Sequence, residues 1–113
     1  MRKQIIENAA FEVAEQVRTV EGAIDDALGE LAELQGRMLR ANGVARISVR
    51  TGQEAFAHLA ATVSSLVHAR GDIGNCHAAL VDATSFVPGL RAVGFGDLTE
   101  CPKGAQADLR IVA

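Results

Sequence analysis

The sequence predicts an all-α protein: an antiparallel hairpin of two long helices that dimerises into a four-helix bundle, followed by an irregular C-terminal arm. Two apolar repeats of 3.5 residues predict the helices, because such a repeat holds one seam against a supercoiled partner. Only 4% of the residues are aromatic, all of them Phe, so Ala, Val, Leu and Ile must form a core of closely packed helices. We therefore expect a helical hairpin domain over residues 1–88 and a Gly-containing arm over residues 89–113.

The composition limits the class of protein and its partners. A chain of 113 residues, 49% of them hydrophobic, has the size and composition of one soluble domain. Its formal charge of -3 and pI near 5.5 provide no positive field for nucleic acid or an anionic membrane. No apolar run approaches the roughly 18 residues of a membrane span, and Glu7 comes too early for a signal peptide. We expect a cytoplasmic protein.

The first predicted helix runs from Gln4 to Ala41. From Ile6, alternate steps of four and three residues reach only apolar side chains. These seam positions are Ile6, Ala10, Val13, Val17, Val20, Ile24, Ala27, Leu31, Leu34 and Met38. The flanking positions lack the Glu/Lys ladders of a two-stranded zipper, which favours a bundle of three or four helices. Asn42 and Gly43 tolerate left-handed geometry and are expected to end the helix, with Arg37 and Arg40 in its last turns.

Acidic side chains are frequent on this first helix. Glu21 and Asp25, like Asp26 and Glu30, lie one helical turn apart. Bundle metal sites of the di-iron kind use a Glu-x-x-His pair, and this helix contains no His. We therefore interpret its acids as a solvated face and predict no metal site.

The connection is predicted to contain a short strand-like segment. Ile47 and Val49 alternate with polar residues between residues 46 and 50. Thr51 and Glu54 then form a Thr-x-x-Glu capping box, which places the start of the second helix at Gly52.

The second predicted helix runs from Gly52 to Val87, before Pro88-Gly89. Its apolar seam positions are Phe56, Leu59, Val63, Leu66, Ile73 and Leu80, with Arg70 and His77 at two further positions in the same phase. Gly71 and Gly74 favour close helix packing, a kink or a break capped by Asp72. We expect a continuous helix because the heptad phase is kept.

The middle of the second helix holds the candidate ligand-binding residues His68, Arg70, Asp72 and His77. His68, Asp72 and Cys76 recur every four residues, but three ligands on one helix face cannot surround a tetrahedral ion without a partner helix. Arg70 and His77 in the bundle could instead hold a small anion, or fix the register of a helix contact. The register interpretation has the most support.

His68 also provides a resemblance to histidine phosphotransfer modules, which are small helical bundles with a His midway along a helix. Arg70 and Gly71 follow His68 here, which is similar to the His-x-Leu-Lys-Gly run of that family. Both residues stand one position earlier than in the family, and the Leu is absent. The resemblance implies phosphotransfer at His68 with Arg70 neutralising the phosphoryl charge.

The remaining features lack a motif that would identify an activity. His58 lies one turn after Glu54, as in an exposed ion pair or hydrogen bond. Cys76 and Cys101 are far apart and are expected to be free thiols. Two arrangements stay open for the β-prone segment 109–112: it pairs with residues 46–49 in a small sheet, within one chain or across two subunits, or it forms an unpaired tail.

No nucleophile with a base at motif spacing, no metal set and no phosphate loop is present in the sequence. The sequence therefore favours a non-enzymatic homodimeric interaction protein, an adaptor or regulator without a cofactor, whose partners are itself and another protein. Phosphotransfer through His68 and anion sensing by Arg70 and His77 are the alternatives.

Overall fold

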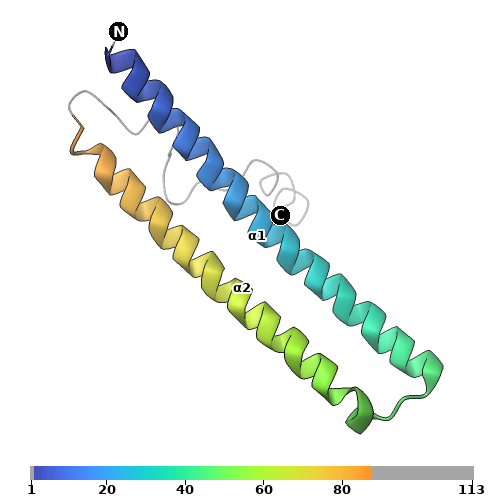
Figure 1. The fold of residues 1–113 in the computed structure, drawn as a ribbon. Coiled ribbons are helices and arrows are strands. Elements are labelled where there is room, and N and C mark those ends of the chain that lie inside the picture. Colours follow the sequence, from blue (N-terminus) through green and yellow to red (C-terminus); the bar gives the residue numbers. More distant parts are fainter. Residues whose placement is uncertain (1, 88–113) are drawn as a thin grey trace, which may run out of the picture. The chain divides into compact units, whose positions relative to one another are not determined.

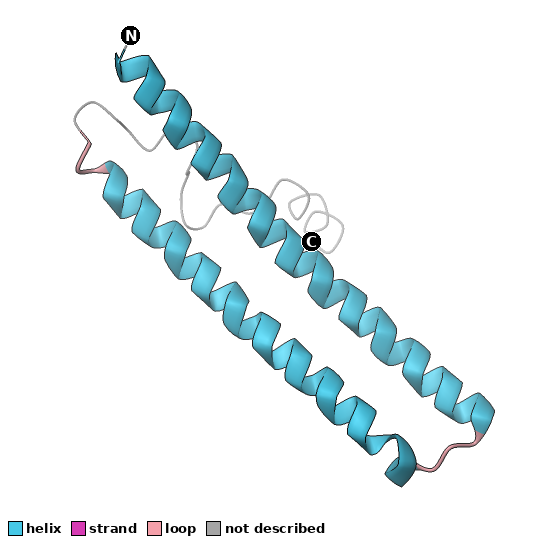
Figure 2. Ribbon diagram, in the orientation of Figure 1, coloured by secondary structure: helices cyan, strands magenta, loops and turns pink. Residues whose placement is uncertain are grey.

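The computed structural model describes residues 2–87, and within them it contains two helices and no strand. Helix α1 spans Arg2–Ala45 and helix α2 spans Val49–Thr84 (Figure 1). Only the loop at residues 46–48 and the turn after Thr84 are not helical in this part of the chain (Figure 2). The predicted all-α class and the pairing of two long helices are confirmed, whereas the dimer stays a prediction.

The chain divides into two units, each of which combines a segment of α1 with a segment of α2. Unit 1 consists of Met1–Gly22 and Asp72–Ala113, and its described residues are 2–22 and 72–87. Unit 2 consists of Ala23–Gly71 and contains the loop. Both helices are continuous where the units meet in sequence, so the predicted continuity of the second helix through Gly71 and Gly74 is confirmed.

The buried apolar core of residues 2–87 is small. In unit 1 it consists of Ala14 and Val17, and in unit 2 of Leu59. The α2 side of the pairing follows the predicted seam, with buried or half-buried side chains at Phe56, Leu59, Val63, Leu66, Ile73 and Leu80. His77 is buried in the same row, and Arg70 is exposed.

The α1 side is rotated relative to the predicted seam. One predicted row is buried or half-buried, at Ala10, Val17, Ile24, Leu31 and Met38. The other buried or half-buried row consists of Glu7, Ala14, Glu21, Leu28 and Asn42. It replaces the predicted row that contains Val13 and Leu34, which are 45% and 46% exposed. Val20 and Ala27 of that predicted row remain half-buried, so the row is displaced toward its two ends only. The rotation turns Glu21 toward α2, where a buried imidazole requires a polar partner.

The end of α1 and the start of α2 differ from the predicted boundaries. α1 continues past Asn42 and Gly43 and ends in a Schellman motif, in which Ile47 N–H donates to Asn42 O at 3.0 Å and Arg46 N–H donates to Gly43 O at 3.3 Å. Arg46 takes the left-handed position of this motif with φ 55°. The prediction that Asn42 and Gly43 end the helix was wrong. Gly43 lies inside α1, and the turn that ends the helix falls three residues later.

Ser48, rather than Thr51, provides the N-cap of α2. Thr51 N–H donates to Ser48 Oγ at 3.3 Å, which is the bond of an N-cap side chain to the third helical residue. The strand predicted over residues 46–50 is therefore wrong, because this cap starts the helix at Val49. The segment 109–112, its predicted partner, lies outside the described residues, as do Cys101 and the predicted C-terminal arm.

α2 ends at Thr84, three residues before the predicted end. Thr84 Oγ1 donates to Val81 O at 2.6 Å, and Ser85 Oγ donates to Asp82 O at 2.7 Å. Backbone bonds to the third preceding residue continue from Ser85 to Val87. These hydroxyls and tighter turns satisfy carbonyls that the helix leaves open at its end.

Candidate functional site

The buried polar pair of unit 1 joins the two helices. His77 Nδ1 lies 3.2 Å from Glu21 Oε2, and the side chains are 9% and 23% exposed. A carboxylate accepts hydrogen bonds, so the imidazole Nδ1–H donates. α2 carries His77 in its seam, and α1 presents the acceptor carboxylate of Glu21 at this level. The pair therefore fixes which faces and which levels of α1 and α2 meet in unit 1.

The corresponding pair of unit 2 is solvated. Arg70 Nε donates to Asp25 Oδ1 at 2.7 Å, while the side chains are 61% and 42% exposed. Arg70 precedes His77 by seven residues, so both occupy the same heptad row of α2. Exposed pairs contribute about 0–1 kcal/mol, because water competes for both charges.

Glu21 and Asp25 are the residues whose roles the sequence analysis missed. They were assigned to a solvated acidic face, but both are half-buried and both contact α2. The missed signal was the match between two acids one turn apart on one helix and two bases at seam positions of the next. Glu12, Glu15, Asp26 and Glu30 are exposed, as a solvated face requires.

These contacts limit what the predicted ligand set can do. Arg70 and His77 each have a carboxylate of α1 as neighbour within their own unit. A small anion would therefore compete with a carboxylate at either base, which weakens the anion-sensor hypothesis. His68 and Asp72 are both exposed on α2.

Metal binding has no preformed site in the described part of the chain. Residues 2–87 bring together no group of three or more His, Cys, Asp and Glu side chains that could hold an ion. Cys76 is an exposed free thiol. The predicted contact between His58 and Glu54 is present, with Nε2 3.7 Å from Oε1, and both side chains are strongly exposed.

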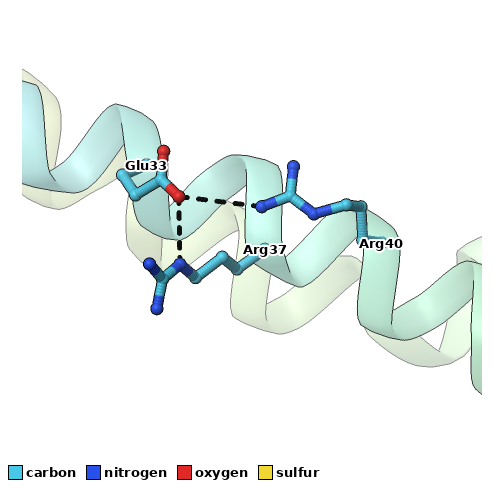
Figure 3. A network of polar contacts seen from close by, with 3 residues as sticks. All are labelled: Glu33, Arg37 and Arg40. Atoms are coloured by element: carbon cyan, nitrogen blue, oxygen red, sulfur yellow. Dashed lines mark hydrogen bonds and ion pairs between the residues drawn. The ribbon is translucent and has the colours of Figure 1, made fainter.

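A small cluster of charged side chains lies on α1 in unit 2 (Figure 3). Glu33 Oε1 lies 3.0 Å from Arg37 Nε and 3.7 Å from Arg40 Nη2. All three side chains are more than half exposed. The sequence predicted both arginines in the last turns of the helix. Because α1 extends to Ala45, they lie before its last turn, and their partner is Glu33.

Large apolar side chains remain exposed on both helices. On α1 they are Ile5, Ile6, Phe11, Val13, Leu34, Leu39 and Val44, and on α2 they are Val49 and Val67. Single exposed apolar side chains are common on protein surfaces, whereas a contiguous apolar patch marks a surface that another chain covers. The predicted dimer-seam residues Val13 and Leu34 belong to this set.

Neither helix of residues 2–87 contains an apolar stretch long enough to cross a membrane. Comparison of the chain with protein families, curated proteins and solved structures gives no match.

Proposed function

We propose that this chain is a non-enzymatic interaction protein that works as a homodimer, with two helices from each copy in a four-helix bundle. The small buried core carries this proposal. Among residues 2–87 only Ala14, Val17 and Leu59 are buried apolar side chains, so neither unit has a core of ordinary size. A two-helix unit buries one stripe of each helix, and a second pair of helices can cover another.

The exposed acids suggest how such a dimer meets other proteins. Glu12 and Glu15 of unit 1 and Asp26 and Glu30 of unit 2 remain in solvent. A bundle that holds these carboxylates outward offers an acidic surface to a basic protein segment, as an adaptor or regulator would. A cytoplasmic location fits this proposal.

Light scattering across a dilution series tests the dimer. We expect a mass of twice the 11.9 kDa chain at micromolar concentration. Arg70→Ala serves as the matched control, because it removes an exposed pair within one chain and should leave the mass unchanged. A mass of one chain at every concentration would overturn the proposal.

Phosphotransfer through His68 is the second candidate, favoured by the exposure of this imidazole on α2. Incubation with acetyl phosphate tests it, since phosphohistidine formation should be lost in His68→Gln and kept in His58→Gln. Arg70, which would neutralise the phosphoryl group, is bonded to Asp25. This contact makes phosphotransfer the weaker candidate, and equal labelling of His68→Gln and wild type would exclude it.

A further inference from the structure

The charge of the chain is unevenly distributed, and a positive segment surrounds the loop of unit 2. Between Glu33 and Glu54 the sequence contains no Asp or Glu, and it contains the four arginines Arg37, Arg40, Arg46 and Arg50. The loop at residues 46–48 joins the end of α1 to the start of α2, so this segment forms one end of unit 2 (Figure 1). We call residues 37–50 the arginine tip.

The positive charge of the arginine tip is only partly compensated. Arg37 and Arg40 share one carboxylate, that of Glu33, at 3.0 Å and 3.7 Å. Arg46 and Arg50 are exposed and form no ion pair within the described part of the chain. The next acid along α2, Glu54, has His58 as its neighbour at 3.7 Å. The arginine tip therefore offers at least two uncompensated cations to an anionic partner.

Exposed apolar side chains lie among these arginines. The exposed fractions are 56% at Leu39, 87% at Val44, 43% at Ile47 and 86% at Val49. Side chains as exposed as Val44 and Val49 have almost no wall of their own chain beside them, so a protein partner would have to supply a groove for them. The headgroup layer of a membrane accepts apolar side chains without a preformed groove, because lipids rearrange around them.

The acids of α1 are too distant to cancel the field of the arginine tip. Glu30, the exposed acid before Glu33, precedes Ala45 by a helix length of about 22 Å at 1.5 Å per residue. This length is more than twice the Debye length of about 8–10 Å at physiological salt. The formal charge of -3, from which no membrane partner was expected, therefore does not describe the surface that the arginine tip presents.

We propose that the arginine tip binds an anionic lipid surface, with its guanidinium groups on lipid phosphates and with Val44, Ile47 and Val49 in the headgroup layer. Guanidinium groups form bidentate bonds with phosphate, and clusters of basic residues with apolar neighbours are typical of peripheral contact with anionic membranes. Neither helix of residues 2–87 enters the bilayer as a span in this arrangement. The inference goes beyond the proposed homodimer and does not depend on it.

Co-sedimentation of the full chain with lipid vesicles tests the inference. We expect binding to vesicles of equal parts phosphatidylcholine and phosphatidylserine but not to phosphatidylcholine alone. Binding should be lost at about 1 M salt, where charges are screened beyond about 3 Å. Arg46→Gln with Arg50→Gln should lower the partition coefficient at least about 10-fold. Arg2→Gln with Lys3→Gln is the matched control, because it removes the same charge from exposed residues of unit 1 and should lower the coefficient less than about 2-fold.

A second pair of variants tests the apolar part of the contact at constant charge. Val44→Ser with Val49→Ser should lower the partition coefficient for the phosphatidylserine vesicles at least about 5-fold, because two apolar side chains no longer enter the headgroup layer. Ile5→Ser with Val67→Ser is the control, since both residues are exposed and lie outside the arginine tip. Far-UV circular dichroism of every variant checks that the helix content is kept.

The remaining outcomes would overturn the inference. Absence of binding to the phosphatidylserine vesicles, or equal binding to both kinds of vesicle, would exclude recognition of anionic lipid. Equal losses in the Arg46/Arg50 and Arg2/Lys3 variants would mean that binding follows net charge rather than the arginine tip. Displacement of the chain from vesicles by a polyglutamate peptide, with no loss in the Val44/Val49 variant, would identify an acidic protein segment as the better occupant. The proposed homodimer would stand in each case, since its test is the mass in the absence of lipid.

Discussion

In each of the two units an acid–base pair joins α1 to α2, but the two pairs differ in their exposure to solvent. Unit 1 places an acid–base pair in the contact, with His77 9% exposed against Glu21. Unit 2 places a pair from the same heptad row of α2 in solvent, with Arg70 61% exposed against Asp25. A desolvated polar pair is costly to break and specifies one alignment, whereas a solvated pair adds little. Helix register is therefore set chiefly by unit 1, and unit 2 depends on apolar contacts.

Leu59→Ala should show the largest effect, because unit 2 has no buried pair to support its contact. Leu59 is 8% exposed, and its truncation should lower the free energy of unfolding by about 2–4 kcal/mol. Urea unfolding at a fixed protein concentration measures the change. Val67→Ala is the control, since Val67 is 55% exposed and should change stability by less than about 0.5 kcal/mol. Equal losses in both variants would show that Val67 is covered in solution.

His77→Ala should lower the free energy of unfolding by about 1–3 kcal/mol, because it leaves the half-buried Glu21 without its hydrogen-bond donor. A double-mutant cycle with Glu21→Ala should give a coupling of about 1 kcal/mol or more, measured from urea midpoints. The matched cycle of Arg70→Ala and Asp25→Ala should give a coupling below about 0.5 kcal/mol. Equal coupling energies in the two cycles would remove the distinction between the units.

Periodicity alone predicted both helices and the α2 seam. The 3.5-residue phase of Phe56 to Leu80 survives in the buried and half-buried positions of α2 because polar or small residues border it and leave one choice of face. On α1 the apolar arc is wider than one neighbour can cover. Which part of the arc faces α2 depends on His77, so a single-helix pattern could not assign Glu21 to the contact or Val13 to the outside.

The role of Glu21 and Asp25 also required knowledge of the register between the helices. Their partners are distant in sequence, and a shift of one turn would have placed other side chains opposite the acids. The length of the loop limits that register, and the loop is bounded by the caps at Arg46 and Ser48, which the strand prediction had missed.

Gly71→Ala and Gly74→Ala should each raise the free energy of unfolding by about 0.5–1 kcal/mol. An added Cβ would meet nothing within 4 Å at either position, so the gain in helix propensity is not opposed by a clash within the chain. Gly71 lies in unit 2 and Gly74 in unit 1, so thermal unfolding of the two variants measures the effect once in each unit. Gly52→Ala is the contrasting variant, since its Cβ would lie 2.8 Å from Asn42 Nδ2 and the amide would have to move. A loss of stability in Gly74→Ala would indicate that another chain packs against α2 at Gly74.

The smallest effect is expected at the end of α1, where Arg46→Gly should stabilise the chain by about 0.5 kcal/mol. Arg46 holds the left-handed position with φ 55°, which glycine adopts without the steric penalty of a Cβ. The gain is reduced because glycine also adds entropy to the unfolded chain. Gly43→Ala is the paired variant. Gly43 lies inside α1 with no atom within 4 Å of an added Cβ, so alanine at this position should stabilise the helix. If Arg46→Gly destabilised the chain while Gly43→Ala stabilised it, the Arg46 side chain would have to contribute more than its backbone conformation costs.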